Sequence, residues 1–408
     1  MKRKLLSQMC NEWRSNIWLS IELIIVSVVL WVIFMFLSWM TYISLREKGY
    51  TTDDIYVAEM KWIPDGANTY VPYDSAHSYT SDMQLLEQHI EQMPYVKYVG
   101  RGSNALPFNF NYHGSQFQTL DADSTSIAYY GNRRFMTADA LRAIELRGRH
   151  GETTEQLIEM AKRGDLLFSD GDYHEWKIED FIGKEVIMGS DSSSIRRVAA
   201  EIYPIPRSDY ETTWGGTVVT LINDNDWAQQ MIIKVKSGAG KRFEEAMTAN
   251  EMRLGNVYLS NLRSIEKERK SVEIEVKRTR YSMGICAVFL MAVIFMGFLG
   301  TFWFRIQQRV PEIALRMVNG ATRGDIFRRL LTEGFVMLIS STVIAVIIEI
   351  LLCKYEVVIV NLVDIKRLSP VWGMAETFVA LALMVLAGIC IPARKAMSIN
   401  PAEALKEE

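Results

Sequence analysis

Side chains capable of metal or acid–base chemistry are scattered along this 408-residue chain rather than grouped. The histidines never occur as HxH or HxxxH, and the cysteines have no zinc-binding spacing. Metal sites usually draw several ligands from such short, regular intervals. We therefore expect surface or half-buried histidines, cysteines that pack in or beside membrane helices, and no metal site. These residues are His77, His89, His113, His150 and His174, and Cys10, Cys286, Cys353 and Cys390.

The stretch Ser237–Lys241, SGAGK, resembles the end of a phosphate-binding loop. It lacks the earlier glycine of GxxxxGK and the hydroxyl residue that should follow the lysine. We predict no ATPase module, no catalytic residue and no cofactor on this chain. ATP-driven work would need a separate subunit that carries the ATP and magnesium.

Three carboxylates lie within or at the ends of apolar runs: Glu22, Glu349 and Glu376. An intramembrane carboxylate is a candidate for proton or ion transfer, because its burial in hydrocarbon is costly. Each lies within about two helical turns of the end of its run. We favour side chains that reach the membrane interface, and keep a relay as the alternative.

The most organised pattern lies at 305–334, where six arginines stand between two membrane-length apolar runs. Pro311 suits the first position of a helix, and Gly320 suits a left-handed helix end. Glu312 and Arg316 are four apart, in the favourable order for an ion pair. The predicted helix also has an apolar stripe, formed by Val310, Ile313, Ala314 and Met317.

A second helix is predicted directly afterwards, with Thr322 as N-cap and Asp325 at the capping-box position. Two interpretations of the first helix stay open. A helix of about nine residues is unstable alone, so its caps and apolar stripe favour a partner that holds it. The alternative is an interfacial helix that rests on lipid headgroups.

Four apolar runs are long enough, or nearly so, to cross about 30 Å of hydrocarbon. Lysines and arginines concentrate before the first run, between the second and third, and after the fourth. The positive-inside rule therefore places both termini and the 305–334 loop in the cytoplasm. The net charge of −3 gives no indication of nucleic-acid binding.

The predicted organisation is an α-helical membrane protein with a large external domain between its first two transmembrane helices. The segments are a cytoplasmic N-terminus at 1–16, transmembrane helices at 17–40, 281–304, 334–352 and 374–391, an external domain at 41–280, a cytoplasmic coupling loop at 305–333, a short external loop at 353–373 and a cytoplasmic C-terminal helix at 392–408.

The external block is predicted to be an α+β domain of two subdomains. Two strand–helix–strand patterns, at 55–99 and 231–262, favour one subdomain with an insertion at about 105–230. The predicted strands are 55–62, 96–99, 185–188, 198–203, 231–236 and 256–262, and the predicted helices are 82–93, 137–145, 154–162 and 242–250.

The segment 264–280 is densely charged, has no glycine or proline, and continues into the second apolar run. We predict a stalk helix of about 25 Å, with Val272, Ile274 and Val276 on a thin apolar line. A stiff helix transmits motion, whereas a flexible linker does not. A passive linker helix is the equally weighted alternative.

The order of one span, a large external domain and three spans resembles the MacB/FtsX-type permeases of ABC transporters. RVPEIALRMVNGATRGDIFRRLLTEG, at 309–334, is very similar to the segment that follows the second span in that family. The C-terminal IPARKAMSINPAEALKEE resembles the family's ending, with Asn400, Pro401 and Glu403 at the N-cap, N1 and N3 positions of a short helix. Within the external block, DLLFSD and FIGKEVI resemble the MacB-like periplasmic core domain.

The resemblance implies that the short helix docks on an ABC ATPase. The residues it assigns to this contact are Pro311, Glu312, Ile313, Ala314, Leu315, Arg316, Met317, Gly320 and Ala321. MacB carries a fused N-terminal ATPase, whereas this chain begins with the anchor segment, which implies a stand-alone permease with its ATPase in trans. The resemblance further implies a homodimer, or a heterodimer with a sibling permease, in the bacterial inner membrane with its large domain in the periplasm.

Two functions then compete. The first is ATP-driven export of drugs, peptides or lipid-linked cargo, which the large external block favours and which would involve a periplasmic adaptor and an outer-membrane exit duct. The second is an FtsX-like mechanotransmitter that regulates a periplasmic partner such as a cell-wall hydrolase. A membrane receptor explains neither the two further spans nor the capped cytoplasmic helix.

Overall fold

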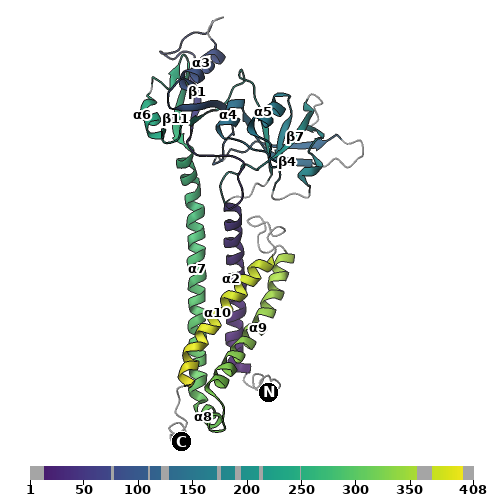
Figure 1. Cartoon of the computed structure of the whole chain (residues 1–408), viewed down its shortest axis with the longest axis vertical. Coiled ribbons are helices and arrows are strands. Elements are labelled where there is room, and N and C mark those ends of the chain that lie inside the picture. The colour runs from purple at the N-terminus through teal and green to yellow at the C-terminus, as the bar shows by residue number, and fades with distance from the viewer. Residues whose placement is uncertain are drawn as a thin grey trace. The chain divides into compact units, whose positions relative to one another are not determined.

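The computed structural model divides the chain into two compact units (Figure 1). The helical unit comprises residues 1–42 and 277–408, and the external unit comprises residues 43–276. The structure describes residues 13–74, 78–108, 111–120, 128–171, 176–188, 194–210, 215–248, 250–355 and 370–397.

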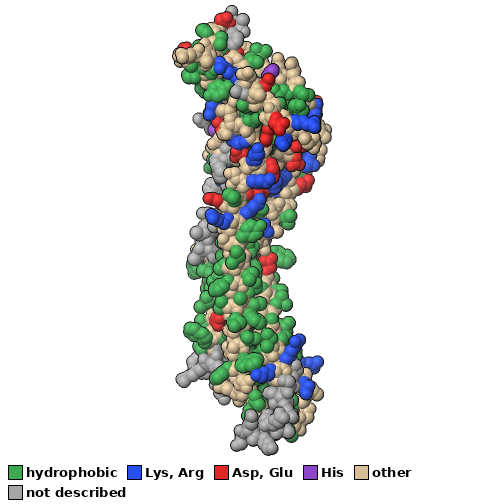
Figure 2. All heavy atoms as spheres, turned by 90° about the vertical axis from the view of Figure 1, so that its left-hand side faces the viewer, with side chains coloured by type: hydrophobic (Ala, Val, Ile, Leu, Met, Phe, Trp, Pro, Cys, Tyr) green, Lys and Arg blue, Asp and Glu red, His purple; other side chains and the backbone are tan. Residues whose placement is uncertain are grey.

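Four helices of the described chain are long and apolar enough to cross a membrane, which confirms the predicted number. Each extends beyond its predicted apolar run, because a membrane helix continues into the polar interface after it leaves the hydrocarbon. Figure 2 shows hydrophobic side chains over much of the helical unit's surface, and charged ones gathered on the external unit. These helices are α2 (Trp13–Ser44), α7 (Ile265–Gln308), α9 (Arg323–Lys354) and α10 (Pro370–Met397).

A hydrophobic core in the helical unit draws side chains from each of its described helices. Leu23 from α2, Phe298 from α7, Leu338 from α9 and Val385 from α10 are all buried in this cluster. Ile313 joins it from the short helix α8 (Val310–Val318). Helix α8 is therefore part of the packed helical unit rather than a separate appendage.

The end of α10 differs from the prediction. The sequence predicts that the fourth span ends at residue 391 and that a proline turn follows, but α10 continues through Pro392 to Met397. A proline removes one backbone hydrogen bond and is tolerated in membrane helices where neighbouring groups satisfy the freed carbonyl. The predicted capping residues Asn400, Pro401 and Glu403 lie outside the described residues.

The external unit is built on one 11-stranded sheet with the order β10-β11-β1-β9-β2-β4-β3-β6-β7-β5-β8. Its first half contains β1 (Ile55–Trp62), β2 (Val96–Ser103), β9 (Gln230–Val235), β10 (Arg253–Leu254) and β11 (Val257–Ser264). Its second half contains β3 (Gly114–Thr119), β4 (Ala128–Met136), β5 (Leu166–Ser169), β6 (Glu185–Met188), β7 (Arg196–Ile202) and β8 (Gly216–Leu221). Most pairs are antiparallel, but β4 pairs with β8 and β5 with β7 in parallel.

The described part of the external unit also contains the short α-helices α3 (Tyr79–Glu91), α4 (Ala138–Ala143), α5 (Thr154–Lys162) and α6 (Gly240–Ala246) and the first turns of α7. Helix α3 carries Met83, Leu86 and Ile90 at helical spacing, and all three are buried in a core with β1, β2 and β9. A second core lies beneath α4 and α5, and a third is formed by aromatic rings around Tyr129 and Phe168.

Each of the ten strands and helices predicted in the external block is present, with ends that differ by a few residues. Strands β3, β4, β5, β8 and β10 have no counterpart in the prediction. The first half of the sheet comes from the two flanking parts of the external block, and the second half comes from the predicted insertion. Both halves belong to one continuous sheet within one compact unit. The division into two subdomains stays a prediction.

The orientation of the chain can be tested with single cysteines in a variant that lacks the four native ones. We expect Asn319→Cys, at the end of α8, to resist a membrane-impermeant maleimide in intact cells, because the positive-inside rule places α8 in the cytoplasm. Lys162→Cys, exposed on α5, should react. The opposite pattern, measured by mass shift after labelling, would overturn the predicted topology.

Candidate functional site

Helix α8 is capped at its C-terminal end as the sequence predicts. Gly320 has a φ of +92°, in the left-handed region that favours glycine. The N–H of Gly320 donates to the carbonyl of Met317 at 3.0 Å, and that of Ala321 donates to the carbonyl of Arg316 at 3.0 Å. This pair of bonds is the Schellman motif, which satisfies carbonyls that the helix leaves free.

The N-terminal end of α8 lies one residue earlier than expected, because the helix begins at Val310 and Pro311 is its second residue. Both positions lie in the first turn, where the missing proline N–H has no helical acceptor to lose. The predicted ion pair is present, since Arg316 lies 2.7 Å from the carboxylate of Glu312.

The apolar stripe of α8 faces the chain's own helices rather than a partner. Ile313 and Ala314 are buried, and Met317 is half-buried against the same core. Ile313 and Ala314 are therefore not available to fill a groove on another subunit, while the predicted contact of α8 with an ATPase stays a prediction. The exposed apolar residues of α8 are instead Leu315 and Val318, with 55% and 62% of their surface accessible.

A group of ion pairs holds α8 and the end of α7 against α9. Glu333 is buried on α9, and Arg309 lies 3.1 Å from its carboxylate. Arg329 lies 3.5 Å from Glu333 and 3.8 Å from Glu312 on α8. Arg309 thus pairs with a buried carboxylate, and its removal would leave that carboxylate without this partner.

The predicted second helix is the beginning of α9 itself. The hydroxyl of Thr322 accepts from the N–H of Asp325 at 3.2 Å, and the carboxylate of Asp325 accepts from the N–H of Thr322 at 3.0 Å. This capping box is as predicted. Helix α9 then runs without interruption into the third span, so the arginine-rich loop is shorter than 305–333.

The remaining candidates for chemistry do not converge. No group of three or more metal-binding side chains exists among the described residues. His89 and His150 pair with Glu251 and Glu201, at 2.5 and 3.0 Å. His77 and His174 lie outside the described residues. Within the helical unit, the hydroxyl of Ser38 donates to Glu376 at 2.8 Å.

The stalk segment forms the first turns of α7, a single helix of 44 residues that begins at Ile265. Val272 packs at the edge of the external core, whereas Ile274 is 67% exposed. Val276 is half-buried. The predicted apolar line is therefore interrupted, and the helix is held to the external unit mainly by Ile265, which is buried, and by charged side chains.

Charged side chains fix the base of α7 within the external unit. Asp209 is buried, accepts from Lys48 at 2.5 Å and forms an ion pair with Arg269 of α7. One turn later, Glu273 is also buried and lies 3.4 Å from Arg269. Burial alone would raise the pKa of Asp209, but the hydrogen bond from Lys48 and the two nearby cations lower the pKa below its usual value.

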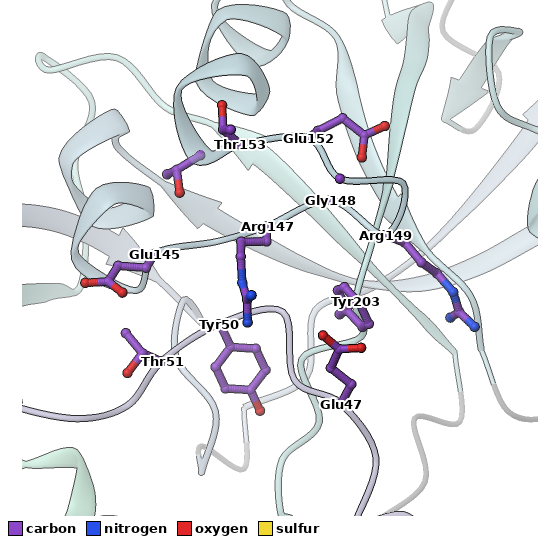
Figure 3. A pocket seen from close by; sticks show the side chains of 12 residues that line it. Glu47, Tyr50, Thr51, Glu145, Arg147, Gly148, Arg149, Glu152, Thr153 and Tyr203 are labelled. Carbon is purple, nitrogen blue, oxygen red and sulfur yellow. The ribbon is translucent and has the colours of Figure 1, made fainter.

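A groove of about 820 Å³ opens near the start of the external unit (Figure 3). In the view of Figure 3 the side chain of Arg147 points toward the ring of Tyr50. The groove is lined by both signs of charge, because Arg149 and Glu47 also border it. We find no grouping of catalytic type among its described side chains.

The comparisons with known proteins concern mainly the C-terminal part of the chain. Residues 284–401 match the family model described as the FtsX-like permease C-terminal domain. Helices α8, α9 and α10 and most of the second span lie in this range. Curated protein sequences contain no significant match to the chain.

Among solved structures, the chain is similar to the extracellular domain of the noncanonic ABC-type transporter YknZ from Gram-positive bacteria. The two share 11% sequence identity with a TM-score of 0.30, over 50% of this chain and 100% of that chain. The C-terminal part of the chain is thus similar to FtsX-like permeases, and the four apolar helices agree with a membrane protein.

Proposed function

We propose that the chain is the permease subunit of an ATP-driven ABC export system of the MacB type. In this proposal a separate ATPase in trans closes on ATP in the cytoplasm, and the movement reaches the external unit through α7. The cargo class is drugs, peptides or lipid-linked molecules that meet the external unit. The chain itself would carry neither a catalytic site nor a cofactor.

The observation that carries the proposal is the match of residues 284–401 to the FtsX-like permease C-terminal domain, which contains α8. Helix α8 supports it further, because it is capped, fixed to its own unit by ion pairs, and still exposes two apolar side chains. Leu315 and Val318 are three apart, and therefore lie on one face of the helix. An exposed apolar pair on a rigid helix is suited to a small groove on a partner.

The residues assigned to the ATPase contact accordingly have different roles in this proposal. Leu315, Val318 and the exposed Arg316 are proposed to touch the ATPase. Ile313, Ala314 and Met317 would support the helix from beneath, and Pro311, Gly320 and Ala321 would set its ends. Glu312 would hold Arg316 and align α8 with α9.

We expect Leu315→Asp and Val318→Asp to abolish co-purification of the proposed partner ATPase. A charge in a desolvated apolar contact costs roughly 2–5 kcal/mol, or a factor of about 30 to several thousand in affinity. Both side chains are exposed, so the helical unit should still fold and reach the membrane. The measurement is quantitative pull-down from solubilised membranes.

Gln307→Asp is the matched control, because it adds the same charge at an exposed position of α7 that lies outside α8. Ile313→Asp is unsuitable, since it would place a charge in the chain's own core. Full recovery of the ATPase with both α8 variants would assign α8 to the lipid interface and remove this contact from the proposal.

The second candidate is an FtsX-like mechanotransmitter that regulates a periplasmic protein such as a cell-wall hydrolase. The continuous helix α7 favours it, because a helix without glycine hinges at its external end is a stiff connection. An ATPase-dependent change in a bound periplasmic enzyme's activity would support this function. ATP-dependent loss of a compound from cells, together with an adaptor and an outer-membrane duct as partners, would support export.

The assembly proposed in either case is a dimer, formed by two copies of this chain or with a sibling permease. The proposed location is the bacterial inner membrane, with the external unit in the periplasm. Membrane lipid surrounds the spans, and nucleic acid is not an expected partner.

A further inference from the structure

Aromatic rings from three parts of the external unit converge at the end of β1. They line a pocket of about 430 Å³ together with one carboxylate. Trp62 and Trp227 are 53% and 44% exposed, which is unusual for side chains of this size in contact with each other. The six side chains that matter are Trp62, Asp65, Tyr70, Tyr73, Tyr79 and Trp227.

The rings stand at right angles instead of forming a flat platform. The planes of Trp62 and Tyr79 meet at 89° with their centroids 6.1 Å apart. Those of Trp62 and Trp227 meet at 77° with centroids 6.2 Å apart. Tyr70 and Tyr73 form a further edge-to-face pair, at 75° and 5.9 Å. Rings at such angles form the walls of a box, and the negative faces of aromatic rings attract a cation placed among them.

The charge at the pocket agrees with a cation. Asp65 is the charged residue among the described residues that line it, and no described residue forms an ion pair or hydrogen bond with its carboxylate. It is exposed at the tip of the turn that follows β1. A carboxylate beside aromatic faces adds a direct attraction for a positive ligand and none for a neutral one.

The loop that carries Asp65, Tyr70 and Tyr73 is fixed from beneath. Asn256, which is buried, accepts from the N–H of Val71 at 2.8 Å and donates to its carbonyl at 2.6 Å. The N–H of Asn256 in turn donates to the buried carboxylate of Asp82 at 2.8 Å. These bonds hold the loop before any ligand arrives, which reduces the entropy lost on binding.

The loop that carries Trp227 is fixed in the same manner by a buried arginine. Arg101 donates to the carbonyls of Asp224 and Asp226 at 2.7 and 3.0 Å, and to the carboxylate of Glu87 at 2.8 Å. Its side chain is almost fully buried. Both walls of the pocket therefore belong to loops that buried polar side chains keep in place.

We propose that this pocket binds small organic cations, and specifically groups that carry an alkylated ammonium. A flat sugar ring prefers a broad, coplanar aromatic surface, whereas perpendicular rings enclose a compact group. An apolar peptide segment would gain nothing from Asp65. An alkylated ammonium presents both apolar methyl groups and positive charge, and quaternary ammonium groups are recognised by such aromatic cages. The proposal does not depend on the ATPase partner.

The test is a titration of the full chain in maltoside micelles with choline chloride, observed by saturation transfer to the choline methyl protons. The matched neutral compound is 3,3-dimethylbutan-1-ol, in which carbon replaces the nitrogen. We expect choline to bind at least about tenfold more tightly than this compound, which corresponds to the cation–π contribution of desolvated sites. Equal concentrations of potassium chloride should not compete.

Trp62→Leu and Trp227→Leu should each weaken choline binding about tenfold, and Asp65→Asn should weaken it several-fold. Tyr130→Leu is the control, because Tyr130 is 50% exposed on β4 and does not line the pocket. All four positions are exposed or half-exposed, so the variants should fold, which circular dichroism can verify.

Equal binding of the neutral compound would indicate an uncharged ligand or an apolar protein contact, and unchanged binding in Trp62→Leu would place choline elsewhere. Either result, or the absence of choline binding at about 100 mM, would overturn the proposal.

Discussion

Arg134→Met is expected to destabilise the external unit by about 3–5 kcal/mol. Arg134 lies on β4 and is 1% exposed. Its guanidinium donates to the carbonyls of Asn104 and Leu106 at 2.9 Å each, and to that of Ile205 at 2.6 Å. Methionine has a similar volume but no donors, so the three buried carbonyls would lose their partner.

The size of this effect follows from the position of the bonds as much as from their number. Asn104 and Leu106 follow β2, and Ile205 follows β7, so one side chain on β4 ties together the exits of two distant strands. Burial lowers the pKa of Arg134 to about 10, and the side chain remains charged at neutral pH. Burying a charged guanidinium costs free energy because the group loses its water. The three hydrogen bonds to carbonyls compensate this loss.

The neighbouring Arg133→Met provides the matched control. Arg133 is half-buried and stacks over Phe135 at 4.5 Å, a contact for which about 0.5–1 kcal/mol is expected. For a domain of this size, 1 kcal/mol shifts the melting temperature by about 2–4 °C. Arg134→Met should therefore lower the transition of the external unit by roughly 10 °C. Scanning calorimetry of the full chain, with hydrogen exchange of β4 and β8 to assign the transition, measures it. Similar shifts for the two variants would contradict this account.

The sequence predicts best those features that depend on neighbours along the chain. The caps of α8 and α9 were predicted from Gly320, Thr322 and Asp325, because a cap uses residues within one turn. Strands with clear alternation, such as Ile55–Trp62, were predicted to within their observed ends. Length and apolar composition likewise gave the number of membrane helices.

Features that depend on distant residues could not be predicted. The pattern of α8 shows which residues are apolar, but it does not show whether the chain or a partner covers them. Ile313 is covered by α7 and α9, and this could only be known once those helices were placed. Strand β8 pairs with β4, which lies some 85 residues earlier, and such non-local pairing leaves little local pattern.

The aromatic pocket shows the same limit. Trp62 ends a predicted strand, and Trp227 lies in a polar turn far along the chain, so neither residue indicates a site by itself. The arginines that position the external loops are also hidden in the sequence. Arg101 and Arg134 stand among strand residues with ordinary neighbours, and only their burial distinguishes them from the many surface arginines.

The second large effect is expected at the external end of α7, if this helix transmits movement between the units. Ile265, Arg269 and Glu273 fix its first turns within the external unit. A flexible insertion near Val272 would break those contacts. A loss of function could then come either from lost packing or from lost helix stiffness. A change at 276–278 is preferable, because it lies at the boundary of the two units and beyond the buried contacts.

Replacing Val276, Lys277 and Arg278 by three glycines should abolish the response of the external unit to the ATPase. Glycine destabilises a helix interior by about 1 kcal/mol per residue relative to alanine, so three glycines make a bend at this point roughly a hundredfold more accessible. The response is measured as the nucleotide-dependent change in hydrogen exchange of strands β1 to β11, in the complex of the chain with its ATPase.

Replacement of the same residues by three alanines is the control. It removes the same side chains and keeps the length and phase of α7, but it retains a stiff helix. We expect the alanine variant to keep most of the nucleotide-dependent change and the glycine variant to lose it, with ATPase binding unchanged in both. An equal response in the two variants would mean that α7 is a passive linker, and that movement reaches the external unit by another route or not at all.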